Sequence, residues 1–119
     1  MNFVFIVIQD MAVLAGSQSE ACFSKYGGSS LPNSPFCHEL ALRILLQTIQ
    51  ASASRYKRVI EPLMSCSIDF YVRVFVRVRT SPQNVKFTAS KTSLVYHCGT
   101  CKETKTQALG KVDLYFVNL

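Results

Sequence analysis

Acidic residues are scarce in this sequence, most of all in its middle. The 119 residues include 13 Lys and Arg but only 7 Asp and Glu, which gives a net charge of +6. Between Arg43 and Lys91, nine basic residues are opposed only by Glu61 and Asp69. This imbalance favours an acidic partner, with nucleic acid first and a membrane surface second.

Several sequence features that define other classes of protein are also lacking. No apolar run reaches the roughly 18 residues of a membrane span. Five cysteines, an odd number without dense spacing, argue against a secreted disulfide framework. No basic residue precedes the apolar residues 3–8 and Asp10 interrupts that run, so we expect no signal peptide. The Gly27–Gly28 pair lacks the spacing of a phosphate-binding loop. We expect an intracellular domain with an apolar core.

The strongest strand pattern covers residues 69–79. Side chains alternate between two faces of a strand. One face is wholly apolar and comprises Phe70, Val72, Val74, Val76 and Val78. The other carries Arg73, Arg77 and Arg79 with aromatic side chains between them. The apolar face predicts a core contact. The arginine row is either solvated or positioned to reach successive phosphates.

Residues 3–8 form a short apolar run without alternation. Such a run predicts a strand buried on both faces, as in a parallel sheet. Asp10 follows at the carboxyl end of this strand, which is where open α/β sheets bind ligands. The simpler interpretation of Asp10 is a turn or cap residue.

A helix is predicted over residues 35–58, with Ser34 as N-cap and Pro35 in its first turn. Its predicted apolar stripe consists of Leu42, Leu45, Leu46, Ile49, Ala53 and Tyr56. Cys37, His38 and Glu39 lie in the first turn. Adjacent helical residues point about 100° apart and do not converge on one metal ion. We therefore expect His38 and Glu39 to pack or to form hydrogen bonds.

Cys98 and Cys101 form a Cys-x-x-Cys motif after a predicted strand at residues 94–97. This spacing is typical of one half of a zinc knuckle, which needs four ligands. No second pair follows, and His97 is badly placed to join the same knuckle. The alternatives are a redox motif or two unpaired thiols. Residues 102–107 are polar and threonine-rich, which predicts a hairpin return strand. Residues 59–66 predict another strand, with Pro62 at an edge or bulge.

Several segments together resemble one family, the tRNA (guanine(26)-N(2))-dimethyltransferases. The matching segments are residues 10–16, 25–27, 37–46, 55–58, 69–78, 89–91, 95–96 and 98–101. Their order and spacing fit the family across roughly residues 10–111. The resemblance implies methyl transfer from S-adenosylmethionine to a guanine amine, in proteins that join a Rossmann-like domain to a tRNA-binding domain. Many eukaryotic members hold zinc in that second domain through two cysteine pairs.

The resemblance implies an α/β fold class, α+β for this fragment. Residues 1–58 would be the last part of a Rossmann-like methyltransferase sheet, and residues 59–111 the start of a mixed α+β C-terminal domain. Residues 112–119 would be a divergent tail. Asp10 would lie near the active-site side, as the single candidate for a catalytic role. The family's cofactor-binding segments lie upstream of the matching part, so we assign no cofactor-binding residue.

The resemblance adds weight to RNA contact by Arg73, Arg77 and Arg79, although these arginines could instead pair with carboxylates of a methyltransferase domain. Cys98 and Cys101 would be the first zinc pair. The expected partner is tRNA, with neither a membrane nor DNA, in the nucleus or the mitochondrion. We expect the chain to be inactive alone. The alternative is a non-catalytic RNA-binding fragment or a regulatory isoform.

Overall fold

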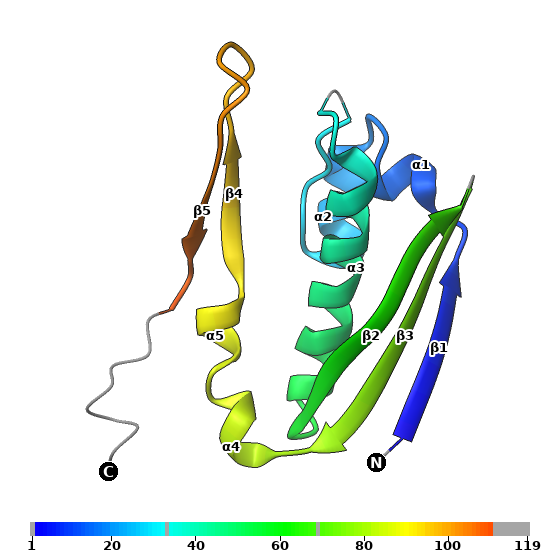
Figure 1. Ribbon diagram of the computed structural model, residues 1–119, viewed down its shortest axis with the longest axis vertical. Coiled ribbons are helices and arrows are strands. Elements are labelled where there is room, and N and C mark those ends of the chain that lie inside the picture. The colour runs from blue at the N-terminus through cyan, green and yellow to red at the C-terminus, as the bar shows by residue number, and fades with distance from the viewer. Residues whose placement is uncertain (1, 33, 69, 111–119) are drawn as a thin grey trace. The chain divides into compact units, whose positions relative to one another are not determined.

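The computed structural model describes residues 2–32, 34–68 and 70–110. The chain divides into two compact units, Met1–Thr80 and Ser81–Leu119. The first unit contains β1 (Asn2–Ile8), α1 (Met11–Leu14), α2 (Ser19–Tyr26), α3 (Cys37–Ser54), β2 (Arg58–Ile68) and β3 (Tyr71–Thr80). The second contains α4 (Pro82–Val85), α5 (Thr88–Lys91), β4 (Ser93–His97) and β5 (Thr104–Ala108). Figure 1 shows these elements along the chain.

The first unit is built on a three-stranded antiparallel sheet with the strand order β1-β3-β2. The alternation predicted for β3 is present in the structure. Val72, Val74 and Val76 are buried, while Arg73 and Arg79 on the other face are exposed. The valines pack against the helices, so one face of the sheet forms the core.

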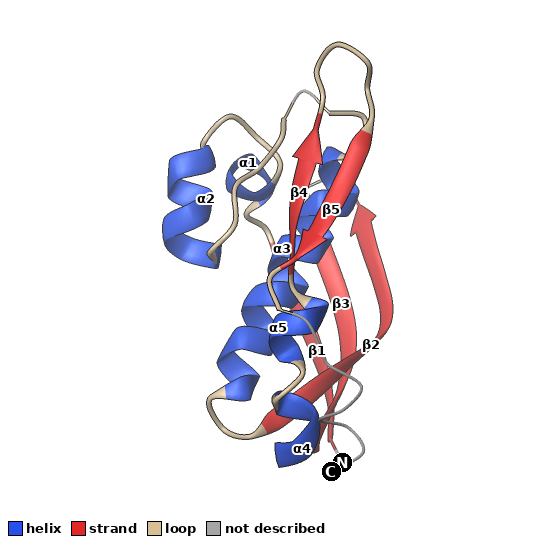
Figure 2. Ribbon diagram, turned by 90° about the vertical axis from the view of Figure 1, so that its left-hand side faces the viewer, coloured by secondary structure: helices blue, strands red, loops and turns tan. Residues whose placement is uncertain are grey.

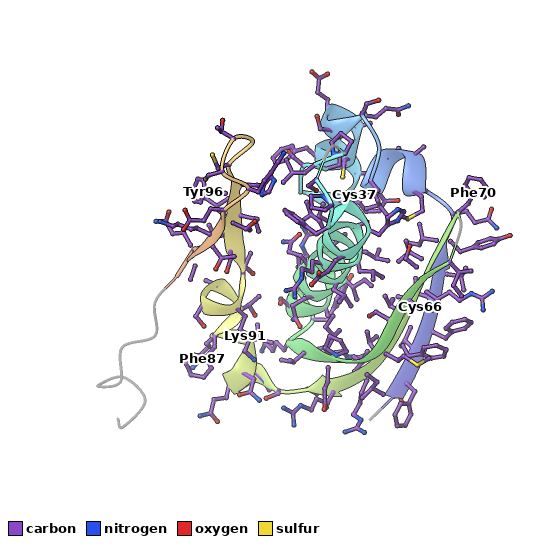
Figure 3. All side chains as sticks on the ribbon, turned by 45° about the horizontal axis from the view of Figure 1, so that its top comes forward. Cys37, Cys66, Phe70, Phe87, Lys91 and Tyr96 are labelled. Carbon is purple, nitrogen blue, oxygen red and sulfur yellow. The ribbon has the colours of Figure 1, made fainter. Side chains whose placement is uncertain are left out.

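Two predicted members of this strand differ from expectation. Phe70 was predicted to join the apolar face, but it precedes the first residue of β3 and its side chain is 78% exposed. Figure 3 shows it at the end of the β2–β3 hairpin. The period of two applies only within a strand, so it does not reach a residue in the turn. Asp69 lies outside the described residues.

The prediction for residues 3–8 was wrong in both pairing and burial. β1 pairs antiparallel with β3, from Asn2 opposite Val78 to Ile8 opposite Val72. Phe3 and Phe5 are 68% and 53% exposed. The run is apolar on both sides, so its composition specifies neither the direction of the partner strand nor the face that a helix covers. Ile6 and Ile8 point to the core.

Helix α3 lies along the core face of the sheet (Figure 1). Its buried residues are Leu40, Ala41, Ile44 and Leu45. Of the predicted stripe, Leu45 is buried and Leu42, Leu46 and Ile49 pack against the core. Tyr56 is 76% exposed, because the helix ends at Ser54 and not at residue 58 as predicted. Ser34 is not the N-cap, because its hydroxyl donates to the Leu31 carbonyl and the helix begins after Phe36. The Ser-Pro pair forms the preceding turn instead.

Strand β2 is an edge strand with an irregularity at Pro62, as predicted. Its register with β3 shifts between Pro62 and Met64. Proline lacks the N–H that a regular ladder needs, which confines it to edges and bulges.

The two compact units of this chain divide after Thr80. The domain division at residues 58–59 stays a prediction. Because β2 and β3 pair with β1, both strands lie in the first unit. The predicted tail at residues 112–119 lies outside the described residues.

The second unit consists of the short helices α4 and α5 and an antiparallel β4–β5 hairpin (Figure 2). The predicted return strand is present as Thr104–Ala108. The hairpin turn holds Cys98 and Cys101, and Lys102 in this turn has a φ of 62°. Across the part of the chain that the structure describes, no helix is both long enough and apolar enough for a membrane span.

Candidate functional site

Asp10 connects the end of β1 to two helices. Its carboxylate accepts a hydrogen bond of 2.8 Å from the Tyr26 hydroxyl and lies 3.4 Å from the Lys25 ammonium group. Its backbone carbonyl accepts the N–H groups of Val13 and Leu14, which start α1. The carboxylate therefore attaches the C-terminal end of α2 to the end of the first strand. The backbone of Asp10 thus acts as the turn residue of the simpler interpretation, and its carboxylate in addition connects α2 to the end of β1.

The groups around Asp10 keep their protons at neutral pH. Burial, followed by the hydrogen bond to the Asp10 carboxylate, raises the pKa of Tyr26 to about 12. Burial also raises the pKa of the Cys22 thiol; a backbone hydrogen bond from Ser30 opposes this rise, and the Asp10 charge adds to it. Tyr26 is therefore a hydrogen-bond donor to Asp10 over the whole physiological range. Neither Tyr26 nor Cys22 has the near-neutral pKa that suits an acid–base catalyst.

Helix α2 is held in place at its C-terminal end by backbone contacts as well. The Thr48 hydroxyl on α3 donates to the carbonyls of Tyr26 and Ile44. Gly27 follows with a φ of 71°, and its N–H bonds the Phe23 carbonyl. A left-handed residue after a helix suits glycine, which has no Cβ to clash. The Tyr26 backbone is thus held independently of its hydroxyl, and its side chain also packs against the core.

His38 and Glu39 form hydrogen bonds, as predicted. The His38 Nδ1 atom lies 3.4 Å from the Ser67 hydroxyl, which connects α3 to β2. Glu39 pairs with Arg43 one helical turn later, at 3.0 Å. The two side chains thus have different partners, Ser67 on β2 and Arg43 on α3.

The three predicted RNA-binding arginines lie in different environments on β3. Arg77 pairs with Glu61 at 3.4 Å and lies over the Phe3 ring, 5.5 Å from its centroid. The Nε atom of Arg77 is buried without a hydrogen-bond partner. Arg73 and Arg79 are exposed, and Arg73 lies over the Tyr71 ring at 5.9 Å. Of the three, only Arg77 has a carboxylate partner among the described residues.

Aromatic residues that sequence reasoning did not assign to a site lie on the same face as these arginines. The register places Phe3 opposite Arg77, Phe5 opposite Phe75, and Val7 opposite Arg73. The rings of Phe5 and Phe75 are stacked, with centroids 4.5 Å apart and an interplanar angle of 17°. The signal in the sequence was Phe75 between two arginines. The sequence did not indicate that Phe3 and Phe5 lie on this face, because that depends on the antiparallel pairing of β1 with β3.

We use the name open sheet face for the side of the sheet opposite α3. It consists of Phe3, Phe5 and Val7 on β1, Arg73, Phe75 and Arg77 on β3, and Met64 and Cys66 on β2. Phe3, Phe5, Val7 and Met64 are between 43% and 68% exposed. The face is thus apolar and aromatic at its centre, with cationic groups beside the rings.

Cys98 and Cys101 lie together in the turn of the second unit, both exposed. The Cys101 N–H donates to the Cys98 sulfur at 3.4 Å, and this bond is the first cause of a lowered Cys98 pKa. The Lys102 N–H bonds the Cys98 carbonyl, and the Cys98 N–H bonds the Glu103 carbonyl. These bonds hold the turn in a shape that exposes a readily ionised thiol.

Two thiols are half of the four ligands that a tetrahedral zinc site would need. The His97 ring nitrogen Nδ1 lies 3.0 Å from the Thr104 hydroxyl. Within residues 2–32, 34–68 and 70–110, no three His, Cys, Asp or Glu residues cluster in a way that suits a metal ion. Cysteine thiolates are suitable zinc ligands, but two cysteines are fewer than the four ligands that a tetrahedral zinc ion needs.

The hollows of the described surface are shallow. One is lined by Ser19, Glu20, Phe23 and Ser29, and another by Ser52, Ala53, Tyr56, Arg58 and Val78. Both are open to solvent and neither includes Asp10.

A family profile described as N2,N2-dimethylguanosine tRNA methyltransferase matches residues 2–115. The chain is 54% identical to tRNA (guanine(26)-N(2))-dimethyltransferase of Schizosaccharomyces pombe over 109 residues, which are 91% of this chain and 20% of the relative. It is 51% identical to the Homo sapiens protein of the same name, over 91% of this chain and 16% of the relative.

A third relative is the mitochondrial tRNA (guanine(26)-N(2))-dimethyltransferase of Saccharomyces cerevisiae, 44% identical over 94% of this chain and 20% of the relative. The chain thus spans between 16% and 20% of the length of these curated relatives.

Among solved structures, the complex of Trm1 from Pyrococcus horikoshii with S-adenosyl-L-methionine matches with a TM-score of 0.83 and 24% identity. The match covers 94% of this chain and 30% of that one. It confirms the predicted fold class.

Proposed function

Because the chain belongs to the N2,N2-dimethylguanosine tRNA methyltransferase family, we propose that it serves the dimethylation of guanine 26 in tRNA. The observation that carries this proposal is the identity of 54% over nearly the whole chain to a relative with that name. The family resemblance inferred from the sequence motifs is confirmed. The chain spans about one fifth of that relative, so the activity itself is part of the proposal.

The reaction needs an electrophilic methyl group and an amine whose lone pair is available. S-Adenosylmethionine would supply the methyl group through its sulfonium. A carboxylate or carbonyl that accepts a hydrogen bond from the guanine amine would favour attack while the amine loses a proton. The Asp10 carboxylate is already bound to Tyr26 and Lys25, which supports an anchoring role in the proposed enzyme rather than contact with the base.

For tRNA binding we propose that Arg73 and Arg79 contact the phosphate backbone. Both are exposed on one strand face, six residues and therefore about 20 Å apart along the strand, so they would reach phosphates that are not adjacent. Arg77 already forms an ion pair with Glu61 and lies over the Phe3 ring. It would therefore orient that ring and contribute less charge to phosphate binding than Arg73 and Arg79. The +6 net charge of the chain supports a polyanionic partner.

We further propose that Cys98 and Cys101 supply two of the four ligands of a structural zinc ion. The lowered pKa of Cys98 favours the thiolate that zinc requires. We assign the protein to the interior of the cell, in the nucleus or the mitochondrion; the yeast relative with a mitochondrial designation supports the second site.

The alternative function is tRNA binding without methyl transfer, as a regulatory form. It is favoured by the net charge of +6 and by the exposure of Arg73 and Arg79. Methyl transfer from radiolabelled S-adenosylmethionine to a tRNA transcript separates the two. Incorporation that disappears when guanine 26 is replaced by adenine would support the enzyme. Binding of the transcript without incorporation would support the alternative.

Filter binding at increasing salt tests the arginine proposal. Arg73→Gln and Arg79→Gln should each weaken binding and reduce the slope of log affinity against log salt by about 1. Arg43→Gln is the matched control, because it removes the same charge from α3, where Arg43 pairs with Glu39. Equal effects at all three positions would show that net charge, not the strand face, is responsible. No binding of the transcript by the parent chain would contradict both functions.

A further inference from the structure

The turn between β4 and β5 brings two thiols together on one short segment. We propose that Cys98 and Cys101 form a reversible disulfide with each other, which makes this turn a redox-sensitive site. The inference deepens the zinc proposal and rests on it only in that a disulfide and zinc-bound thiolates exclude each other, because zinc binds the reduced, ionised form. Oxidation would therefore release the metal, and bound zinc would protect the thiols.

Hydrogen bonds within the turn itself determine its shape. The Cys98 N–H bonds the Glu103 carbonyl at 2.9 Å, which closes the loop of residues 98–103. The Lys102 N–H bonds the Cys98 carbonyl at 3.1 Å, and the Cys101 N–H donates to the Cys98 sulfur at 3.4 Å. These bonds join residues of one loop. The proximity of the two thiols is therefore a local property, which does not depend on how much of the family's length this chain covers.

The turn places the two side chains near the spacing of a disulfide. The bond from the Lys102 N–H to the Cys98 carbonyl joins residues four positions apart, as in one turn of an α-helix. Residues three positions apart in such a turn have Cβ atoms about 5–6 Å apart. A disulfide needs roughly 3.5–4.5 Å between its Cβ atoms, so an adjustment of about 1–2 Å within the loop closes the bond.

The strands on either side hold the ends of this loop. β4 pairs with β5 from Ser93 opposite Ala108 to His97 opposite Thr104. Across the last of these pairs, the His97 ring nitrogen Nδ1 lies 3.0 Å from the Thr104 hydroxyl. The hairpin thus keeps the two thiols within one short loop, which raises the effective concentration of each thiol toward the other.

Exchange with a small disulfide such as oxidised glutathione forms the bond in two steps. One thiolate of the pair attacks a sulfur of glutathione disulfide, the S–S bond breaks, and one glutathione thiolate leaves. The other thiolate then attacks the protein sulfur of this mixed disulfide, and the second glutathione leaves. The two protein thiols lose two electrons in all, and glutathione disulfide is reduced to two glutathione molecules, whose thiols take up the two protons.

Trypsin makes the state of the pair measurable in the parent chain. Cleavage after Lys91 and Lys102 releases peptide 92–102 with both thiols, and the remaining cysteines fall on three other peptides: Cys22 on 1–25, Cys37 on 26–43 and Cys66 on 59–73. The folded chain is equilibrated in mixtures of reduced and oxidised glutathione, quenched with acid, treated with a thiol-blocking reagent and digested. In mass spectra, peptide 92–102 should lack both thiol hydrogens and carry no reagent.

The dependence on reduced glutathione separates this disulfide from a glutathione adduct. At fixed oxidised glutathione, an about tenfold fall in reduced glutathione should raise the disulfide-to-dithiol ratio about 100-fold, because two glutathione molecules are released. An adduct on one thiol releases one molecule, so its ratio should rise only about 10-fold. Cys101→Ser should stop at an adduct on Cys98. Cys66→Ser is the matched control, since it removes a thiol from β2 and should leave the ratio unchanged.

A peptide 92–102 that remains a dithiol in oxidised glutathione, or that carries only adducts with the weaker dependence, would overturn the disulfide. Where the disulfide forms, the measurement is repeated with zinc chloride. Slower oxidation supports the zinc role as well, whereas an unchanged rate refutes the zinc role and leaves the disulfide standing. Absence of tRNA binding and of methyl transfer refutes the proposed function alone, because peptide 92–102 is measured without RNA.

Discussion

Replacement of Tyr26 by phenylalanine isolates the contact that joins α2 to the end of β1. The change removes one hydroxyl, which donates to the Asp10 carboxylate at 2.8 Å. The ring keeps its packing, and the Thr48 bond to the Tyr26 backbone carbonyl does not depend on the hydroxyl. Tyr26→Phe therefore tests the hydrogen bond rather than the fold of α2.

The expected loss follows from the charge and exposure of the acceptor. A hydrogen bond to a charged group contributes about 1.5–3 kcal/mol. The Asp10 side chain is 30% exposed and Lys25 lies 3.4 Å away, so water and the ammonium group compensate in part. We expect unfolding free energy to fall by about 1–2 kcal/mol, which lowers the Tm of a unit of this size by roughly 5–15 °C.

Urea denaturation followed by circular dichroism measures this loss. Tyr56→Phe is the control, since Tyr56 is 76% exposed and its change should stay within about 0.5 kcal/mol. The double mutant with Asp10→Asn should show a coupling energy of roughly 0.5–2 kcal/mol. Additive effects of the two changes, or equal losses at Tyr26 and Tyr56, would refute the assignment of Asp10 as an anchor.

Three further predictions concern the core, the thiols and the response to pH. Val74→Ala should cost roughly 2–3 kcal/mol in urea denaturation, because Val74 is fully buried, while Val7→Ala at a 43% exposed position should cost far less. Cys98 should react with a thiol reagent at lower pH than Cys22, whose pKa is raised by burial; a faster reaction of Cys22 in stopped-flow traces would contradict this. The Tyr26 pKa is raised in the folded state, so its contribution to stability is complete below pH 10 and decreases as the pH approaches 12. Thermal melts of the parent chain and Tyr26→Phe should converge over that interval, and parallel curves would count against it.

The part of the fold that the sequence predicts best is β3. Its two faces differ in chemistry, so alternation alone separates Val72, Val74 and Val76 from the arginines. The hairpin around Cys98 was predictable for a similar reason, because polar, threonine-rich residues follow a short apolar strand. Local composition decides both elements.

Other features depend on contacts that composition does not encode. The β1 run is apolar on both sides, so the sequence could not identify Phe5 as exposed or β3 as its antiparallel partner. The Asp10–Tyr26 bond joins residues 16 positions apart across a loop. The helix start after Phe36 rather than at Ser34 reflects competition, since the Ser34 hydroxyl bonds the Leu31 carbonyl instead. Tertiary contacts decide each of these cases.

The central position of β3 has a consequence for synthesis on the ribosome. Asn2 and Ile8 at the ends of β1 pair with Val78 and Val72, so β1 has its described partner only after β3 has been made. Until then the phenylalanines and isoleucines of β1 are exposed to other nascent chains. The segment between β1 and β3 is long, and the entropy cost of closing it opposes pairing before any contact between the two strands stabilises the unit. Helix α3, made in between, is local and can form first. The folding of the first unit is therefore coupled to translation and depends on protection of β1 from aggregation during that interval.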